Sequence, residues 1–305
     1  MLTFTPIQEA IITPSPPKRF SLNFLLIIIR EEGDRMAIEV FNRCEKKYML
    51  TSTQMKDLKK LMSQHMILDP HCNEHGTYKI CNIYYDSVDD RLIRASIEKP
   101  VYKEKLRMRS YDTPSGNDQV FVEIKKKYQG IVNKRRTSMS LDHAKAYLDG
   151  RLSSRDLIEM EEMVNPQVLE EIDYFKGFYG CIPKLYLSYD RQAFFERDDG
   201  DFRVTLDSNI ETRRYDLGLD MGSYGKQLLK EDTYLMEIKI NKAVPLWFAH
   251  ILSQLEINPV SFSKYGTEYK NFVLDRVEKN INRNYEGEKI CLNQFLQQQQ
   301  MEPSA

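Results

Sequence analysis

Charged and apolar side chains alternate along much of this chain, and this alternation constrains the fold more than any other feature. Residues i, i+2 and i+4 of a β-strand point to the same face of a sheet. Lys105, Arg107 and Arg109 are separated by the apolar residues Leu106 and Met108. Similar segments recur through the chain, so we expect an antiparallel sheet with one charged face and one apolar face.

The same pattern places the expected strands along the chain. They are Ala37 to Leu50, Tyr78 to Tyr85, Leu92 to Lys99, Lys103 to Tyr111, Gln119 to Tyr128, Ile131 to Thr137, Lys184 to Phe194, Phe202 to Ile210 and Tyr234 to Ile240. Helical patterns interrupt the strands at Thr53 to Gln64, at Ser140 to Tyr179 with a break at Asn165-Pro166, and at Val244 to Leu255.

Both ends of the chain depart from this pattern. Residues 1–35 are an atypical segment that holds a Pro-rich stretch and an apolar run, Phe20 to Ile29. That run is shorter than the ~20 residues that a membrane-spanning helix needs. A signal peptide would also contain such a run, but no small-residue cleavage site follows it. We favour the hypothesis that Met36 is the native start, that 36–290 form one folded domain, and that 291–305 are a flexible tail.

Composition limits the classes of partner. The 305 residues are 41% hydrophobic, which is enough for a substantial core, and the net charge is only -1. Whole-chain charge therefore gives no argument for nucleic acid or for an anionic membrane. The 5 cysteines form no CxxC pair, which suits reduced thiols and predicts a cytoplasmic protein. A zinc site at His71, Cys72, His75 and Cys81 matches no standard finger spacing.

The charged face has two interpretations. It is either the wet side of a sandwich or the lining of a closed barrel. Rows of cations on neighbouring strands repel one another unless an anion or a metal lies between them. We therefore expect an α+β fold in which an antiparallel β-barrel forms a tunnel with a charged lumen, and in which helices cover the apolar outer face.

Arginine and lysine in a lumen would suit a polyanionic phosphate ligand, because guanidinium groups match phosphate oxygens in a bidentate manner. Carboxylates there are unfavourable beside phosphate unless they hold Mg²⁺ or Mn²⁺. Glu237 is the best candidate metal ligand, followed by Glu123 and Glu45, and each could instead hold a neighbouring lysine or arginine in place. The sequence shows no nucleophile elbow and no Walker A loop, so phosphoryl transfer by positioning and charge neutralisation fits best.

Nine segments in this order resemble those of the VTC-domain polyphosphate polymerases, a branch of the triphosphate tunnel (CYTH-like) superfamily. They are FNRCEKKY at 41–48, IYYDS at 83–87, KLRMRSY at 105–111, VFVEIK at 120–125, NKRR at 133–136, SYDRQAF at 188–194, FRVTLD at 202–207, LMEIK at 235–239 and SFSKYG at 261–266. The resemblance extends from about Ile38 to Phe272.

The resemblance implies an ATP-dependent polyphosphate polymerase that moves the γ-phosphate of ATP onto a growing inorganic polyphosphate chain with Mn²⁺ or Mg²⁺. The residues expected to act in catalysis are Lys47, Arg107, Arg109, Lys125, Arg191, Arg203 and Lys264. Further phosphate contacts are expected from Lys134, Arg135, Arg136 and Lys239. The placement of Lys134 depends on the match to the family, because after a one-residue slip Arg135 or Arg136 would take its role. The expected metal ligands are Glu237, Glu123 and Glu45.

Two departures from the family qualify this hypothesis. Neither the SPX sensor domain nor the membrane helices of eukaryotic members are found in these 305 residues, so inositol-phosphate regulation and vacuolar translocation are not implied. The expected ligands are ATP and polyphosphate without nucleic acid, and a membrane partner stays open. Arg43 stands where the superfamily often has a Glu of its ExExK motif, which favours chain synthesis over hydrolysis or cyclisation. The alternatives are a triphosphate hydrolase of the same fold and a non-catalytic polyphosphate-binding protein.

Overall fold

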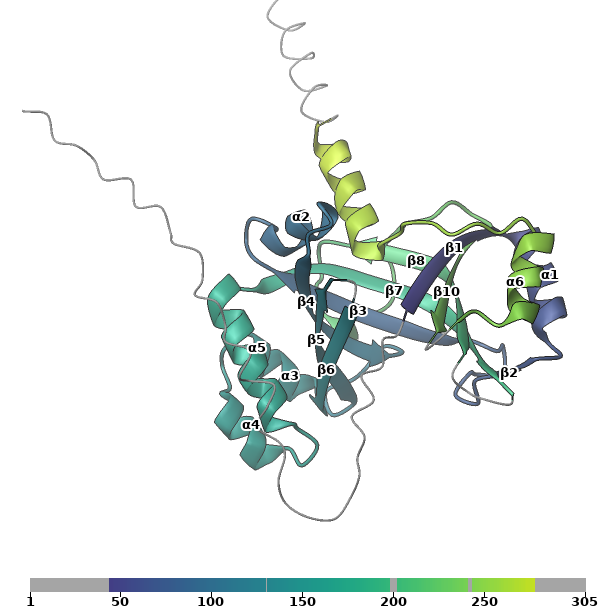
Figure 1. Ribbon diagram of the computed structural model, residues 1–305. Helices are drawn as coiled ribbons and strands as arrows, with labels where there is room; N and C mark the ends of the chain where they lie inside the picture. Colours follow the sequence, from purple (N-terminus) through teal and green to yellow (C-terminus); the bar gives the residue numbers. More distant parts are fainter. Residues whose placement is uncertain (1–43, 130, 198–201, 241–242, 278–305) are drawn as a thin grey trace, which may run out of the picture. The chain divides into compact units, whose positions relative to one another are not determined.

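The computed structural model describes residues 44–129, 131–197, 202–240 and 243–277, which belong to the unit Phe41–Ala305 (Figure 1). Its strands are β1 (Cys44–Thr51), β2 (Met66–Leu68), β3 (Tyr78–Asp86), β4 (Tyr102–Tyr111), β5 (Gln119–Tyr128), β6 (Ile131–Ser140), β7 (Ile182–Glu196), β8 (Arg203–Arg213), β9 (Lys226–Gln227) and β10 (Thr233–Ile240). The segments predicted at 1–35, at 37–43 and at 291–305 lie outside the described residues.

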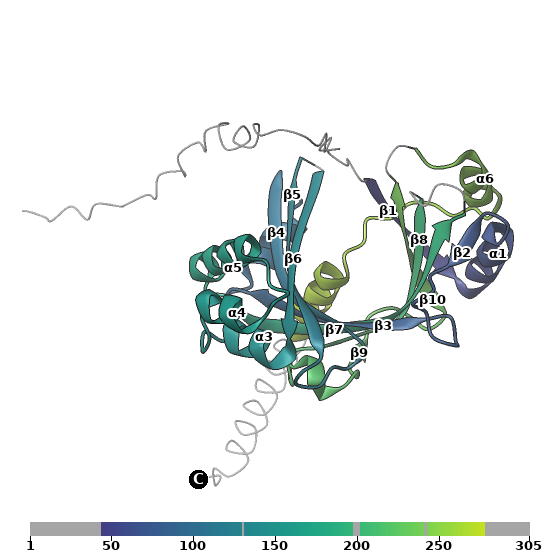
Figure 2. The same ribbon diagram turned by 90° about the horizontal axis from the view of Figure 1, so that it is seen from below.

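These strands form one antiparallel sheet in the order β1-β10-β8-β7-β3-β4-β5-β6, while β2 pairs with β7 and β9 pairs with β8. The sheet curves strongly, so that β4, β5 and β6 face β1, β10 and β8 across its concave side (Figure 2). The backbone pairing does not close the ring, because among the described residues β1 and β6 are the two ends of the path. An ion pair between Lys125 of β5 and Glu45 of β1 spans this seam, with Nζ 3.6 Å from Oε2.

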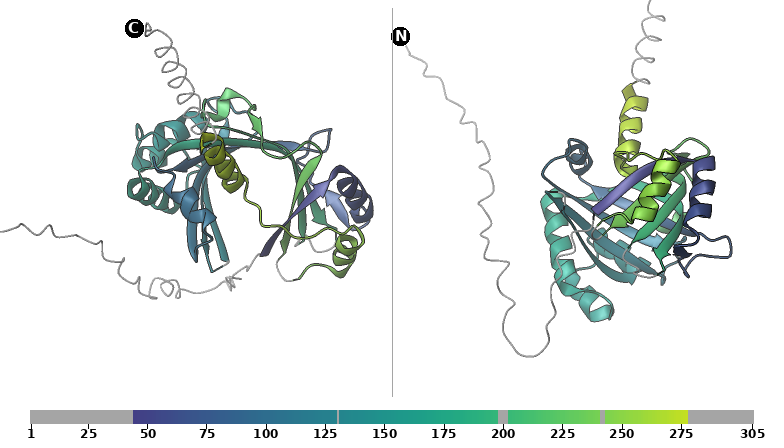
Figure 3. Two further views of the ribbon diagram at one scale, coloured as in Figure 1. Left: turned by 90° about the horizontal axis from the view of Figure 1, so that it is seen from above. Right: turned by 45° about the vertical axis from the view of Figure 1, so that its right-hand side comes forward.

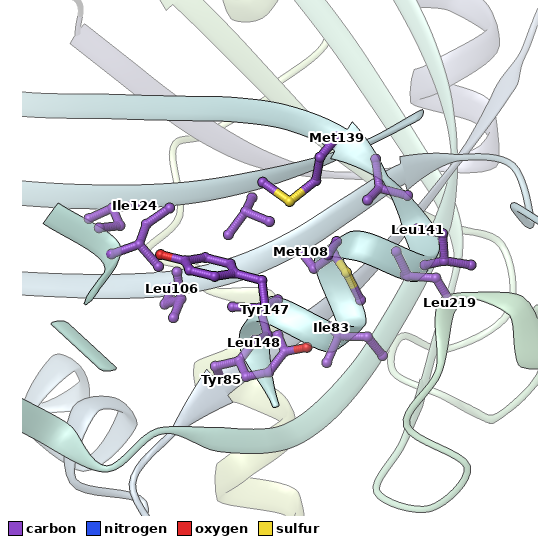
Figure 4. Packing of buried hydrophobic residues seen from close by; sticks show 14 of the residues in the cluster. Ile83, Tyr85, Leu106, Met108, Ile124, Met139, Leu141, Tyr147, Leu148 and Leu219 are labelled. Atoms are coloured by element: carbon purple, nitrogen blue, oxygen red, sulfur yellow. The ribbon is translucent and has the colours of Figure 1, made fainter. Parts of the chain in front are cut away.

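One part of the convex, outer face packs against α3 (Leu141–Leu148), α4 (Ser154–Met160) and α5 (Pro166–Tyr179). The alternate residues of β4 and β5 that were expected to be apolar, among them Leu106, Met108 and Ile124, are buried there (Figure 4). Tyr147 of α3 joins the same cluster. The alternation thus turns the apolar residues of these strands toward a layer of helices, as predicted.

The other part of the outer face packs against α1 (Ser52–Met62) and α6 (Leu246–Gln254), which lie side by side (Figure 3). Val204, Met236 and Ile238 of the sheet are buried beneath Leu58 of α1 and Phe248 of α6. A reciprocal capping box between Thr51 and Gln54 begins α1. Both helices were predicted, and their amphipathic faces meet the apolar strand face.

An apolar cluster also occupies one part of the concave, inner face. Ile80, Leu187 and Leu235 of the strands pack there with Ile93 and with Tyr265. Tyr265 belongs to a helix at 264–277. Its ring lies 4.9 Å from that of Tyr84. This cluster fills part of the inner face, and the charged residues gather on the remainder.

Two predicted elements differ from the structure. The segment Leu92 to Lys99 is not a strand but the helix α2 (Arg91–Ile97). The buried carboxylate of Asp86 accepts hydrogen bonds from the backbone N–H groups of Leu92 at 2.8 Å and of Ile93 at 2.9 Å, which satisfies the first turn of this helix.

The single helical region predicted at Ser140 to Tyr179 is divided into α3, α4 and α5. Ser153 caps α4, and Asn165 caps α5 with Pro166 in its first turn, so the predicted break at Asn165-Pro166 is confirmed. None of the helices that the structure describes is long and apolar enough to cross a membrane.

Candidate functional site

The strand register brings the charged residues of seven strands to the inner face. Lys47 lies opposite Glu237, Arg191 opposite Asp207, and Arg107 opposite Glu123, so these residues point to one side of the sheet. Together with Lys264 they form what we call the inner-face cluster. Its members are Glu45, Lys47, Lys105, Arg107, Arg109, Glu123, Lys125, Lys134, Arg136, Arg191, Arg203, Asp207, Glu237, Lys239 and Lys264.

Glu237 of β10 is the centre of one half of the cluster. Its Oε1 lies 3.1 Å from Nζ of Lys47 and 3.3 Å from Nζ of Lys264, and its Oε2 lies 3.7 Å from Nη2 of Arg191. Burial alone would raise the pKa of Glu237, but these three cations outweigh burial and hold the pKa well below its usual range. Glu237 is therefore ionised at any physiological pH.

Asp207 of β8 holds two of the same cations, and it was not among the predicted site residues. Its Oδ1 accepts a hydrogen bond of 2.6 Å from Nε of Arg191, and its Oδ2 accepts bonds of 2.8 Å from Nη2 of Arg191 and 2.6 Å from Nζ of Lys264. Asp207 is completely buried. Burial opposes ionisation, yet Arg191 and Lys264 keep the pKa of Asp207 lowered. The sequence pattern that could have identified Asp207 is its spacing from Arg203, which places both residues on the same face of the strand.

Glu123 of β5 organises the cations on the facing wall. Nε of Arg107 donates to its Oε2 at 2.6 Å, and Nζ of Lys134 lies 2.5 Å from its Oε1. Nε of Arg109 lies 4.0 Å from Oε2. Burial would raise the pKa of Glu123, but these cations lower it to about 2. Glu123 is thus a permanent anion that orients three predicted phosphate-binding residues.

Glu45 joins the two walls across the seam. Its carboxylate lies 3.3 Å from Nζ of Lys47 and 3.6 Å from Nζ of Lys125. Burial and the neighbouring Glu237 act to raise the pKa of Glu45, whereas Lys125 and Lys47 lower it, and the net result is a lowered pKa. One ammonium group, that of Lys47, therefore lies between two carboxylates, Glu45 and Glu237.

Some lysines of the cluster have fewer anionic neighbours. Burial lowers the pKa of Lys105, Lys134 and Lys239 to about 8. For Lys239 the nearby Arg191 lowers the pKa further, and for Lys105 the nearby Lys103 does so. Among the described residues no ion pair joins Lys105 or Lys239 to a carboxylate. Glu237 and Glu45 act to raise the pKa of Lys239 but do not offset burial, so the cations of this surface are only partly neutralised by its carboxylates.

The remaining arginines contact aromatic rings. The guanidinium carbon of Arg203 lies 4.6 Å from the centre of the Phe195 ring, and that of Arg136 lies 4.7 Å from the centre of the Phe121 ring. Arg203 also lies 3.7 Å from a carboxylate oxygen of Asp69. These contacts leave part of each guanidinium group free to meet an anion.

Tyr84 of β3 and Arg109 of β4 are both buried on the inner face of the sheet. Nε of Arg109 donates to Oδ1 of Asn82 at 2.9 Å, and its Nη2 lies 3.3 Å from the hydroxyl of Tyr189. Burial would raise the pKa of Tyr84, but Arg107 and Lys105 lower it to about 8. A phenol whose pKa falls in this way reports a strongly positive local potential.

Arg135 is the one predicted phosphate-binding residue that the fold does not bring to the cluster. Lys134 and Arg136 face inward on β6, so Arg135 between them points to the outer face. There its guanidinium lies 3.3 Å from Glu171 and donates to Gln167 at 2.9 Å, both on α5. The strict alternation of β6 thus places Lys134 and Arg136 on the inner face and Arg135 on the outer face.

The predicted metal ligands do not form a complete cage by themselves. Within the described ranges no three His, Cys, Asp or Glu side chains are grouped to hold a metal ion. Glu123 and Glu237 each contact three cations, and Glu45 contacts two. Glu237 and Glu45 flank a single ammonium group and fit a different arrangement, in which Mg²⁺ or Mn²⁺ takes one or two protein carboxylates and its other ligands come from water and substrate phosphates.

Two solved structures are distantly similar to this chain. A putative adenylate cyclase from Bacillus halodurans is 15% identical, with 73% of this chain and 95% of that chain covered and a TM-score of 0.40. A putative adenylyl cyclase from Hippeastrum, described as having a dominant triphosphatase activity, is 16% identical, with 74% and 95% covered and a TM-score of 0.42. TM-scores in this range carry no argument about function.

Sequence comparison gives a more specific result. Vacuolar transporter chaperone complex subunit 4 from Schizosaccharomyces pombe is 23% identical over an alignment of 283 residues, with 78% of this chain but only 38% of that protein covered. The chain therefore spans well under half the length of this relative. The family model of the VTC domain matches residues 42–273, which include every member of the inner-face cluster. The chain belongs to the VTC domain family.

Proposed function

We propose that this chain is an ATP-dependent polyphosphate polymerase, which transfers the γ-phosphate of ATP to the end of a growing inorganic polyphosphate chain. The observation that carries the proposal is the excess of cations over carboxylates in the inner-face cluster. Lys105 and Lys239 form no ion pair with a carboxylate among the described residues, and their pKa values are lowered to about 8. A linear polyanion would supply the missing negative charge along several strands at once.

The arginines are held in orientations that suit phosphate. Asp207 binds the Nε and Nη2 groups of Arg191, and Glu123 binds Nε of Arg107. Each guanidinium has five N–H donors, so both arginines keep donors for phosphate oxygens. Asp207 and Glu123 are buried and act as positioning residues, since they fix the arginines before a substrate binds.

The proposed reaction needs little covalent chemistry from the protein. An oxygen of the terminal phosphate of the chain attacks the γ-phosphorus of ATP and forms the new P–O bond. The bond from the γ-phosphorus to the bridging oxygen breaks, and ADP leaves with that electron pair. The second pKa of a terminal phosphate is about 6, so the attacking oxygen is ionised at neutral pH without a general base. The ammonium groups of Lys47 and Lys264 neutralise charge on the phosphate oxygens.

We propose Glu237, with Glu45 beside it, as the protein ligand of Mn²⁺ or Mg²⁺. When bound, such an ion supplies further neutralisation of the phosphate charge. The three cations around Glu237 keep its carboxylate ionised, which a metal ligand requires. The Schizosaccharomyces pombe relative is named as a subunit of a complex. For this chain we propose ATP and polyphosphate as the ligands of the inner-face cluster.

The products of the reaction test the proposal. The full chain is incubated with ATP and Mn²⁺, and polyphosphate, ADP and orthophosphate are measured separately. A polymerase gives polyphosphate whose phosphate content equals the ADP released. Orthophosphate equal to the ADP would identify a triphosphate hydrolase, and unchanged ATP would identify a binding protein. An Arg107→Ala variant, which loses a group of the cluster, should lose the activity.

A further inference from the structure

Four lysines face one another at one end of the β4–β5 pair. In the antiparallel register Lys103 lies directly opposite Lys127, and Lys105 lies directly opposite Lys125. All four share the inner face, since they alternate with residues of the outer face such as Leu106 and Ile124. Like charges directly opposite each other destabilise a sheet, so two such pairs in succession call for an explanation.

The structure supplies little negative charge to offset this repulsion. Lys125 lies near Glu45 at 3.6 Å across the seam, while Nζ of Lys103 donates only to the backbone carbonyl of Ser96 at 3.3 Å. Lys105 lies over the Tyr265 ring at 5.7 Å. Within the part of the chain that the structure describes, Lys103, Lys105 and Lys127 form no ion pair. Burial, with Lys127 and other lysines nearby, also lowers the pKa of Lys103.

Lys103 and Lys127 extend the inner-face cluster, which already holds Lys105 and Lys125, to the end of the strands. Lys105 is two residues from Arg107, and Lys103 is two residues further, so each step along the strand is about 7 Å. Beyond Lys103 and Lys127 the pair ends at Tyr102 and Tyr128. The row of cations therefore leads from the buried arginines to the ends of β4 and β5.

The chemistry of the row favours a polyanion without bases. Single-stranded nucleic acids are held by cations together with aromatic rings on which the bases stack. The exposed rings at this end, Tyr102 and Tyr128, alternate with the lysines and so lie on the opposite face, where the Tyr102 hydroxyl donates to Glu104 at 2.7 Å. On the inner face the side chains at this end of β4 and β5 are lysines, and the Tyr265 ring beside Lys105 is buried.

We propose that Lys103, Lys105, Lys125 and Lys127 form a lysine track that binds the distal phosphates of a long polyphosphate chain where it leaves the inner-face cluster. This inference rests on the proposed function for the identity of the polymer. What it adds is the site at which the polyphosphate leaves the protein, namely the Tyr102 and Tyr128 ends of β4 and β5. Short anions reach no further than Lys105 and Lys125, which belong to the cluster, whereas long chains also reach Lys103 and Lys127. Chain length is thus sensed by Lys103 and Lys127.

A double variant, Lys103→Gln/Lys127→Gln, tests the track in the full chain. Its affinities for tripolyphosphate and for long-chain polyphosphate are measured by titration calorimetry without ATP. We expect the affinity for the long chain to fall about tenfold, as two charge-assisted contacts are lost, and the affinity for tripolyphosphate to change less than about twofold. Lys103→Arg/Lys127→Arg keeps both charges and should restore long-chain binding.

The matched control is Lys56→Gln/Lys60→Gln, which removes two exposed lysines from α1 on the outer face. It should bind both anions as the unmodified protein does. Equal losses for the short and long anions, no loss for either, or tight binding of single-stranded DNA that also depends on Lys103 and Lys127 would overturn the track. These affinities need no turnover, so a failure to synthesise polyphosphate would refute the proposed function and leave the binding result to be judged separately.

Discussion

Asp207→Asn should destabilise the protein strongly because it removes a buried charge that two buried cations share. Asp207 is completely buried, and its oxygens lie 2.6 and 2.8 Å from Arg191 and 2.6 Å from Lys264. Removing one partner of a buried charge network typically costs 3–5 kcal/mol. Glu237 still contacts both cations, so we expect the lower end, about 3 kcal/mol. For a domain of this size that loss lowers Tm by roughly 6–12 °C.

The assay is thermal unfolding of the full chain with and without tripolyphosphate. The asparagine cannot neutralise Arg191 and Lys264, so an added anion should take over part of the role of the carboxylate. A ligand at 100 times its Kd stabilises by about 2.7 kcal/mol, and tighter binding to the variant increases this effect at a fixed ligand concentration. Tripolyphosphate should therefore raise the Tm of Asp207→Asn more than that of the unmodified protein.

Asp190→Asn is the matched control on the opposite face of the sheet. Asp190 forms an ion pair of 2.9 Å with Lys79, and both side chains are partly exposed. Such a pair is worth about 0–1 kcal/mol, so its loss should lower Tm only slightly. The reasoning fails if the two variants melt alike, or if tripolyphosphate stabilises Asp207→Asn no more than the unmodified protein.

Three further predictions concern catalysis, register and protonation. Glu237→Gln should lower metal-dependent turnover by at least about 100-fold. It should bind tripolyphosphate as well as before or better, because the lost negative charge no longer repels phosphate. A turnover assay and titration calorimetry on the same variant check both expectations. Arg136→Gln should weaken tripolyphosphate binding, whereas Arg135→Gln on the outer face should not, and equal effects would contradict the register of β6. The pKa of Lys105 is lowered to about 8, and a bound anion raises it, so binding should take up protons near pH 8 and weaken as the pH rises through this value. Calorimetry in buffers of different ionisation enthalpy measures this uptake, which Lys105→Gln should reduce.

The alternation of the strands was enough to predict the two faces of the sheet. Period-two spacing assigned Arg107, Glu123 and Glu237 to the charged side and Leu106 and Val204 to the helix-covered side, and the structure confirms this division. The division was readable because it depends only on the local geometry of a strand. Asp207 also follows this rule, but its importance depends on Lys264, 57 residues away, whose position the alternation does not give.

The alternation did not predict features of the fold that depend on contacts between residues distant in the sequence. The segment at Leu92 was read as a strand, although Leu92, Ile93 and Ser96 are buried along one side of a helix. The beginning of α2 is stabilised by Asp86, which is fixed in turn by a hydrogen bond of 3.1 Å from the Tyr265 hydroxyl. Similarly, the alternation predicts an inner face but cannot show whether the edge strands pair, and the described sheet ends at β1 and β6.

The transfer of label from ATP tests the central claim most directly. The full chain is incubated with Mn²⁺, unlabelled polyphosphate and ATP that carries a radioactive γ-phosphate, and the products are separated by chain length. The account predicts label in the polyphosphate, first at the chain ends, with one ADP formed for each phosphate incorporated, and no transfer by Arg107→Ala. Label that appears only in orthophosphate, or that stays in ATP, would contradict it.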